Sequence, residues 1–386
     1  MNVTMISSLS GDLTFLQRIL LTTAALCALG VIALPLTSDG STSLHAHLFH
    51  GFAFTVLLLA IGWMLWPLRL KQAPLLFAGA AILVSFAGAA FLIKALAIAG
   101  PGGGFWSGVL AAWAMGWFAV ERLSAIDTRN NWLKWVLRLV IPIAFGVWLL
   151  LVWEFVTRGF GVPQVLLPSP SAIGHRFITS TATLWVDFKQ TFLKAVLIGY
   201  AIGCSSGFLV ALLIDRSDFL KRGLLPIGNL VSALPVVGVA PIMVMWFGFD
   251  WPSKAAVVVI MTFFPMLVNT VAGLSASDEM QRDLMKTYAA SYGQSLFKLR
   301  LPQALPFIFN ALKINATLAL IGAIVAEFFG TPIVGMGFRI STEVGRMNVD
   351  MVWAEILVAA VAGSMFYGII SLIERMLTFW HPSFRN

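Results

Sequence analysis

Long apolar runs alternate with short polar connections along almost the whole chain. A helix needs about 20 mostly apolar residues to cross a bilayer. Ten runs come near that length: 17–36, 49–66, 74–98, 104–120, 135–156, 191–214, 225–248, 254–274, 306–328 and 352–374. The seventh run contains Pro226, Pro235 and Pro241, and proline interrupts helices. The pattern predicts an all-α polytopic membrane protein with about ten transmembrane helices.

The composition excludes the main soluble classes. Hydrophobic residues make up 59% and charged residues 11% of the 386 residues, whereas a typical soluble domain has about 25% charged residues. A soluble globule could not cover so much apolar surface, and a disordered chain would contain far less of it. We therefore expect a lipid bilayer as the main partner, and no nucleic acid despite the net charge of +8.

Basic residues collect in cytoplasmic loops, so they predict the topology. With the N-terminus inside and ten alternating spans, 16 Lys and Arg lie on the cytoplasmic side and 7 on the outer side. Lys94 and Lys313 lie within spans, and we expect Lys313 to extend toward the cytoplasmic surface. This asymmetry predicts a multi-pass protein with both termini in the cytoplasm.

The chain changes character after its fourth apolar run. Residues 1–120 hold four spans with short connections and form an N-terminal membrane extension. Residues 121–134 form a polar cytoplasmic linker, and residues 135–386 hold six spans with longer connections. We therefore predict a module boundary within 121–134.

One cytoplasmic connection, residues 275–302, has a helical pattern of its own. Ser277 is a suitable N-cap, and Leu284, Tyr288 and Tyr292 follow at helical spacing on one apolar face, up to Gly293. One interpretation is a helix lying on the membrane surface. The alternative is a docking helix that fits a groove on a cytoplasmic partner.

This connection resembles the signature of binding-protein-dependent ABC importer permeases. The signature reads Glu-Ala-Ala, three residues, Gly, nine residues, Ile, one residue, Leu-Pro. The positions that match it are Asp283, Leu284, Met285, Ala289, Leu299, Leu301 and Pro302. The resemblance implies that these residues, with Tyr288 of the apolar face, form a coupling helix to an ATPase. Neither Ala of the signature is kept, and Ala289 replaces the Gly that permits a sharp turn. We therefore expect the bend to move, toward Gly293.

Further stretches resemble the branch of this family that imports nitrate, sulfonates, taurine and pyrimidine precursors. They include Leu167–Ser171, Leu234–Gly248, Phe263–Thr270, Ile321–Glu327 and Gly335–Gly337. The resemblance covers about 135–386 and implies a type I permease core of six spans. It also implies a bacterial cytoplasmic (inner) membrane and an external solute-binding protein.

The chain carries no sequence motif for hydrolysing ATP. No lysine follows a glycine, so there is no GxxxxGK[ST] phosphate loop. We expect a transport subunit and not an enzyme, with no cofactor of its own, and with ATP and Mg on a separate cytoplasmic ATPase dimer. A six-span core also needs a second permease subunit to enclose a path, and we expect a homodimer.

Polar and aromatic residues within the later spans are candidates for the translocation path. They are Asn229, Ser232, Trp246, Phe264, Asn269, Asn315, Thr317 and Glu327. Polar groups inside a membrane face a path or another helix, so contacts between helices are the alternative for each of them. No catalytic motif is present, and we interpret His45, His47 and His50 as an interfacial loop and not as a metal site.

The candidate lining favours a neutral or weakly charged ring as the solute. Amides, hydroxyls and aromatic faces suit a pyrimidine-like or vitamin-precursor heteroaromatic. Nitrate, taurine or an alkanesulfonate is the alternative, and these anions would require a basic group or a helix N-terminus. A self-contained secondary transporter is a second alternative, although we find no charged relay or inverted repeat.

Overall fold

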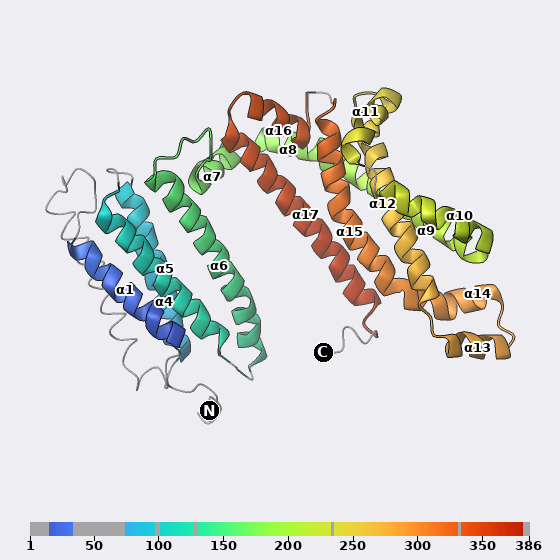
Figure 1. The fold of residues 1–386 in the computed structure, drawn as a ribbon, viewed down its shortest axis with the longest axis horizontal. Coiled ribbons are helices and arrows are strands. Elements are labelled where there is room, and N and C mark those ends of the chain that lie inside the picture. The colour runs from blue at the N-terminus through green and yellow to red at the C-terminus, as the bar shows by residue number, and fades with distance from the viewer. Residues whose placement is uncertain are drawn as a thin grey trace. The chain divides into compact units, whose positions relative to one another are not determined.

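A computed structural model describes residues 15–33, 74–96, 101–126, 128, 130–232, 235–330 and 333–380. All the elements within these ranges that Figure 1 labels are helices. Residue contacts divide the chain into two compact units, Met1–Ala172 and Ile173–Asn386. The predicted all-α fold is confirmed.

The first unit is a helical bundle centred on α5 (Gly103–Ser124). This helix packs against α1 (Phe15–Ala33), α4 (Pro74–Leu96) and α6 (Asn131–Gly159). Small side chains let membrane helices approach closely, and alanines fill this core: Ala24, Ala28, Ala81, Ala89, Ala111 and Ala112. The expected span 49–66 and the loop with His45, His47 and His50 lie outside the described residues.

The helix α6 groups with the first unit by its contacts. It begins after Asn130, whose side chain accepts a hydrogen bond from the Trp132 backbone N–H (3.0 Å). Its Trp148 lies against Gly116 of α5, where any Cβ would overlap the indole ring. The compact unit thus extends past residue 135, and a permease core that starts there stays a prediction.

The second unit contains two long continuous helical rods. The first rod, Thr181–Arg216, joins α8 (Thr181–Phe188), the π-helical η1 (Lys189–Val196) and α9 (Leu197–Arg216). The second rod, Tyr292–Glu327, joins α14 (Tyr292–Ser295), the π-helical η2 (Leu296–Arg300) and α15 (Leu301–Glu327). Between them lies α12 (Trp251–Ser275), which packs against both α9 and α15 (Figure 1).

Glycines let α9 and α12 pack closely. Gly199, Gly203 and Gly207 recur every fourth residue on α9 and face α12. A Cβ at Gly199 would lie 2.7 Å from the Ala255 carbonyl oxygen, so a side chain at this position could not be accommodated without separating the helices. This stripe is the small-residue spacing typical of membrane helix pairs.

The remaining helices lie around this centre. They are α7 (Pro170–Thr179), α10 (Asp218–Ser232), α11 (Val236–Phe247), α13 (Glu279–Thr287), α16 (Met336–Gly345) and α17 (Val349–Leu377). The predicted seventh span is therefore not one helix, because α10 and α11 divide it. Of the helices in the described ranges, six are long and apolar enough to cross a membrane, and α5 and α6 are two of these six.

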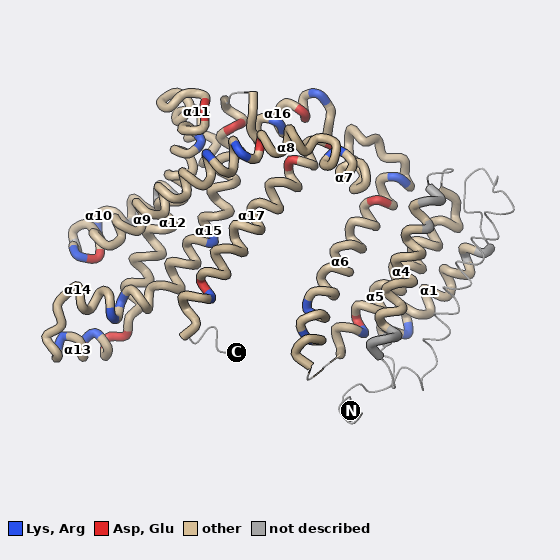
Figure 2. Tube along the Cα trace, turned by 180° about the vertical axis from the view of Figure 1, so that it is seen from behind, with Lys and Arg blue, Asp and Glu red and all other residues tan. Residues whose placement is uncertain are grey.

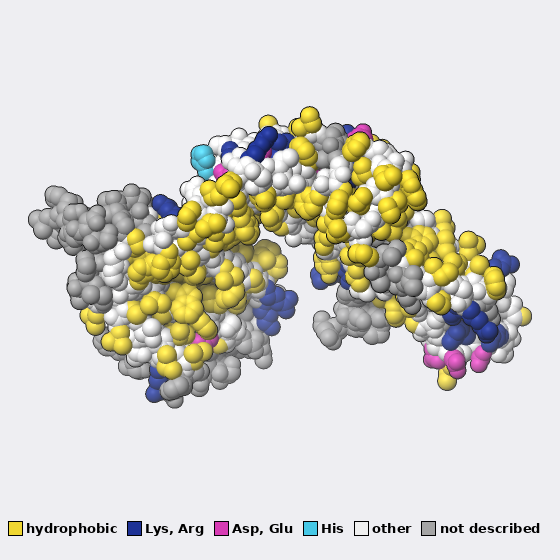
Figure 3. All heavy atoms as spheres, turned by 45° about the horizontal axis from the view of Figure 1, so that its top comes forward, with side chains coloured by type: hydrophobic (Ala, Val, Ile, Leu, Met, Phe, Trp, Pro, Cys, Tyr) yellow, Lys and Arg dark blue, Asp and Glu magenta, His cyan; other side chains and the backbone are white. Residues whose placement is uncertain are grey.

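Charged side chains of the second unit gather toward two places. In Figure 2, Lys, Arg, Asp and Glu cluster around α13 and α14 and, at the other end of α15, around α8 and α16. Much of the helix surface between them is apolar (Figure 3). Lys313 lies between these ends, and its ammonium forms an ion pair with Glu374 at 2.8 Å. Glu374 lies near the end of α17 (Val349–Leu377), and the expected extension of Lys313 toward the cytoplasmic surface stays a prediction.

Candidate functional site

The connection between α12 and α15 forms two short helices. The first, α13, begins after Asp278, whose carboxylate accepts a hydrogen bond from the Met280 backbone N–H (3.1 Å). Glu279 in the first turn and Lys286 in the last turn both oppose the helix dipole favourably. The cap is therefore one residue later than predicted, and Ser277 is buried instead.

The bend between the two short helices lies at Ala289. Its φ is +51°, a left-handed conformation that residues other than glycine rarely adopt. The backbone N–H groups of Ala289 and Ala290 reach back to carbonyls of Lys286 (2.8 Å) and Met285 (2.9 Å), which closes α13. The expected shift of the bend to Gly293 is wrong, because Gly293 lies within α14. The signature position keeps its turn without its glycine.

The second short helix, α14, leads directly into the membrane rod. Ser291 caps it, and Ser291 and Gln294 form a reciprocal capping box. A single helix with Leu284, Tyr288 and Tyr292 on one face was therefore the wrong prediction, since the bend places Tyr292 on the next helix. From Tyr292 the chain stays helical to Glu327, which is about 50 Å at 1.5 Å per residue.

The helix α13 is exposed and mostly polar, but Leu284 within it and its C-cap residue Tyr288 present large apolar side chains. Within α13 no residue is buried, and Leu284 is 56% and Tyr288 78% exposed. A nine-residue helix is marginal by itself in water, so a partner that covers these side chains would stabilise it. Of the predicted coupling residues, Asp283 and Ala289 are also exposed, whereas Met285, Leu299, Leu301 and Pro302 are half-buried.

A polar cluster that we did not predict anchors the segment to the membrane helices. The Arg300 guanidinium forms two hydrogen bonds with the Asp215 carboxylate, at 2.7 and 2.5 Å. Its Nε and Nη2 also donate to the Leu274 carbonyl, at 3.1 and 3.0 Å. The Tyr292 hydroxyl donates to Asp215 at 2.8 Å. The available signal was weak: Asp215 directly follows the apolar run 191–214, and Arg300 lies between Leu299 and Leu301 of the connection 275–302.

The candidate path residues are dispersed over the second unit. Trp246 and Thr317 are exposed, and Phe264 and Asn269 are half-buried. Asn315 is fully buried, and its amide donates to the Thr262 carbonyl (2.7 Å) and to Cys204 Sγ (3.2 Å). The side chains of Asn229 and Ser232 lie outside what the structure describes.

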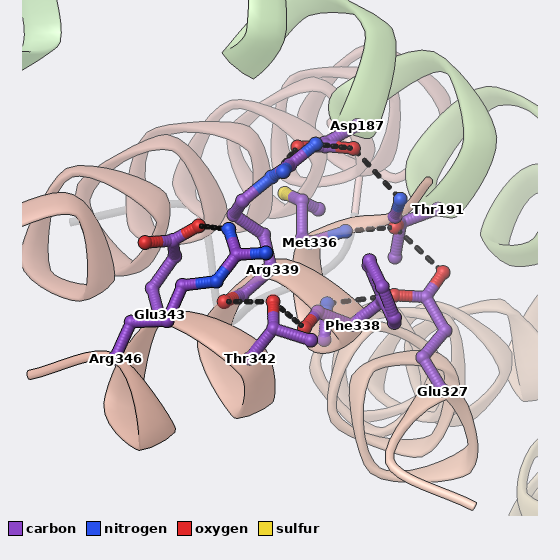
Figure 4. A network of polar contacts seen from close by, with 11 residues as sticks. Asp187, Thr191, Glu327, Met336, Phe338, Arg339, Thr342, Glu343 and Arg346 are labelled. Carbon is purple, nitrogen blue, oxygen red and sulfur yellow. Dashed lines mark hydrogen bonds and ion pairs between the residues drawn. The ribbon is translucent and has the colours of Figure 1, made fainter. Parts of the chain in front are cut away.

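Glu327 ends the rod in a buried polar network with α16 (Figure 4). Its carboxylate accepts hydrogen bonds from the Thr191 hydroxyl (2.7 Å) and the Gly337 backbone N–H (2.6 Å). Thr191 in turn accepts from the Met336 N–H (2.8 Å). Three consecutive N–H groups at the start of α16 thus bind side chains, because Gly335 donates to Asp187 (2.7 Å).

Glycine is required where this network closes. Gly335 has φ +134°, and a Cβ there would lie 2.7 Å from the Glu327 carboxyl carbon. A Cβ at Gly337 would overlap the Ile324 carbonyl oxygen. Gly335 and Gly337, which belong to the resemblance in the sequence, therefore let the backbone come close to the Glu327 carboxylate.

Two charged groups near this end lie outside the membrane spans and have displaced pKa values. Hydrogen bonds to Asp187, with the Arg339 Nε donating at 2.8 Å, raise the pKa of the Arg339 guanidinium. The backbone N–H of Trp251 and the amide of Gln190 hold the pKa of the Asp250 carboxyl below its ordinary value. Both groups therefore stay charged at neutral pH and hold helix ends in place.

Within the described ranges, no group of three His, Cys, Asp or Glu residues is placed to hold a metal ion. The second unit is also continuous along its length. An exposed helix, a bend and an anchored rod connect one end of the second unit with a buried network at the other end.

Comparison with known proteins gives one consistent family. Residues 199–379 match the family described as binding-protein-dependent transport system inner membrane component. A probable ABC transporter permease protein from Haemophilus influenzae is 32% identical over 242 residues, which cover 62% of this chain and 98% of that protein. The formylaminopyrimidine transport permease protein ThiX from Halalkalibacterium halodurans is 33% identical, covering 62% and 95%. The taurine transport system permease protein TauC from Escherichia coli is 26% identical, covering 66% and 94%. The chain thus belongs to the permease subunits of binding-protein-dependent ABC transporters.

Proposed function

We propose that this chain is the membrane half of an ATP-driven importer that takes up a pyrimidine-like or vitamin-precursor heteroaromatic. An external binding protein would deliver the solute. A separate cytoplasmic ATPase dimer would bind ATP and Mg, and a second copy of the chain would complete the path. Membership in the permease family sets aside the self-contained secondary transporter.

The observation that carries the coupling role is the exposed helix α13. Leu284 within α13 and its C-cap residue Tyr288 are exposed, and no residue of α13 is buried. Exposed apolar side chains of this kind fit a groove on a partner. Because α14 continues into α15 without a break, a displacement at the ATPase would be carried along the rod to Glu327.

The exposed candidates are the ones we propose for the path. Trp246 and Thr317 are open at the surface of a single chain, and Phe264 and Asn269 are partly open, so a second copy could face them across a path. Asn315 and Glu327 are buried within one chain. For these two we favour the alternative, which is contact between helices.

The relatives favour a heteroaromatic solute over an anion. ThiX, the formylaminopyrimidine permease, is 33% identical, and RibX, a riboflavin permease of Chloroflexus aurantiacus, is 30% identical. The sulfonate, taurine and nitrate permeases are 25–28% identical. The relatives named for ring compounds are thus more similar in sequence to this chain than those named for sulfonate, taurine or nitrate.

Two basic residues in the later spans already have partners, which also argues against an anion. Lys313 pairs with Glu374 at 2.8 Å. Lys254 is buried and donates to the Phe249 carbonyl (2.6 Å) and the Ser253 hydroxyl (3.1 Å). An anionic solute would have to displace these partners to be neutralised.

The test is uptake by proteoliposomes that contain the permease with its co-expressed ATPase and binding protein. We expect ATP-dependent uptake of labelled formylaminopyrimidine, and none of taurine or nitrate. Calorimetry on the isolated binding protein should show the same preference. Uptake of taurine or nitrate without the ring compound would replace the proposed solute by an anion.

A further inference from the structure

We infer that the ion pair of Asp215 and Arg300 forms a rigid joint. Through it the coupling segment, which consists of α13, α14 and η2, moves as one body with the membrane helices α9, α12 and α15. Arg300 is the positioning residue, and Asp215 fixes its guanidinium. This inference deepens the proposed function and rests on it, because it concerns how motion at α13 enters the membrane. It assigns a role to the variable position between Leu299 and Leu301, to which the family signature gives none.

The joint connects the ends of three helices through one guanidinium. Arg300 stands where η2 becomes α15, Asp215 lies at the end of α9, and Leu274 lies at the end of α12. The bidentate pair with Asp215 has distances of 2.7 and 2.5 Å, and the Leu274 carbonyl accepts two further bonds at 3.1 and 3.0 Å. The last carbonyls of a helix lack partners within it, so Arg300 satisfies one of them.

Burial makes this pair more rigid than a surface ion pair. The Arg300 side chain is 15% exposed and the Asp215 side chain 5%. A bidentate guanidinium fixes orientation as well as distance, which a lysine could not do. By contrast, both side chains of the Lys286–Asp283 pair on α13 are exposed to solvent. Such exposed pairs contribute little.

The second short helix is attached to the same joint. The Tyr292 hydroxyl donates to Asp215 at 2.8 Å, and the Arg216 guanidinium lies 5.7 Å from the centre of the Tyr292 ring. Both ends of the stretch from Tyr292 to Arg300 are thereby held against α9. The π-helical turn Leu296–Arg300 lies between these contacts.

The mechanical consequence follows from where the chain can bend. Ala289 forms a turn between α13 and α14, so a push on α13 alone could be absorbed there. The joint holds the far side of that turn to α9, α12 and α15 together. A displacement of α13 then moves the three helix ends in one step instead of deforming the connection.

The test uses the intact complex of permease, ATPase and binding protein in proteoliposomes. Arg300→Gln should leave ATPase association unchanged and lower solute uptake per ATP hydrolysed by about tenfold, which is within the range for coupling changes along a contact network. Asp215→Asn should have a similar effect, and the double variant should be no worse than either single one. Arg176→Gln, which removes the partly exposed ion pair with Asp350 (3.0 Å), is the matched control and should retain full coupling.

The outcomes separate this inference from the proposed function. If the unmodified complex shows no ATP-dependent uptake, the proposed function fails. If that complex pumps and Arg300→Gln transports as much per ATP, the joint has no role and the inference is overturned. Additive losses in the double variant would also overturn it. Should Arg300→Gln not fold, Arg300→Lys keeps the charge, and full uptake per ATP in that variant would overturn the inference.

Discussion

Ala289 has a backbone conformation that costs an alanine free energy. The left-handed region brings Cβ close to the following carbonyl oxygen, which costs about 1–2 kcal/mol per residue. Its φ of +51° persists because the closing hydrogen bonds to Lys286 and Met285 and the capped α14 fix the chain on both sides. The residue thus stores a small strain at the bend of the coupling segment.

Replacing Ala289 by glycine should relieve this strain. We expect Ala289→Gly to raise the free energy of unfolding by about 1 kcal/mol, since glycine adopts positive φ without the Cβ penalty. Thermal unfolding of the purified protein in detergent measures the change. Ala290→Gly is the neighbouring control, and it should give no gain because Ala290 has no positive φ. A lower melting temperature for Ala289→Gly would show that the turn is not strained.

Gly337 presents the opposite case, a glycine that cannot be replaced. A Cβ there would meet the Ile324 carbonyl and the Glu327 side chain. We expect Gly337→Ala to lower the free energy of unfolding by about 1–3 kcal/mol, the usual cost of overpacking. Gly345→Ala on the same helix, where a Cβ meets nothing within 4 Å, should change it little. Equal melting temperatures for the two variants would contradict the network of Figure 4.

At the scale of elements, close packing of α9 on α12 forms the centre of the second unit. Gly203→Ala should destabilise the protein by about 1–3 kcal/mol, because a methyl group there would meet the Thr262 hydroxyl and the Val259 carbonyl. Gly223→Ala on α10 should instead be neutral or stabilising by up to about 1 kcal/mol, since its site is open and alanine favours helices. Thermal unfolding of both variants compares them, and a harmless Gly203→Ala would contradict this packing.

The sequence predicted the helical class and most of the long helices, because hydropathy reports directly on length and polarity. It did not predict how the seventh run divides into α10 and α11, although Pro226, Pro235 and Pro241 marked it as broken. Proline shows where a helix is disturbed, but tertiary contacts decide whether it kinks or ends.

The candidate site was predictable in place but not in shape. The spacing of Asp283, Ala289 and Pro302 pointed to the connection in which the structure has α13 and α14, and the coupling role of this connection stays a prediction. Helical periodicity alone could not show the bend, since Tyr292 continues the spacing of Leu284 and Tyr288 by chance. The Asp215–Arg300 pair joins residues 85 positions apart, and no local pattern reports on such a contact.

At the scale of the whole molecule, the basic residues predict which side each end of the second unit faces. We expect a cysteine at Lys286 to react with a membrane-impermeant maleimide only in inverted vesicles, and a cysteine at Arg346 only in intact spheroplasts. The native Cys27 and Cys204 are half-buried and buried, and the parent protein gives their background. Labelling of both positions from the same side would refute the topology.

The central claim is that α13 receives the ATPase, and co-purification of a co-expressed ATPase subunit tests it most directly. Leu284→Glu combined with Tyr288→Glu should leave the permease inserted, with an unchanged melting temperature, and remove most of the bound ATPase. Val344→Glu on α16 is the control, because Val344 is as exposed as Leu284, at 56%. It should retain the ATPase as the unmodified chain does. Full retention by the double variant, with a well-folded permease, would contradict the account.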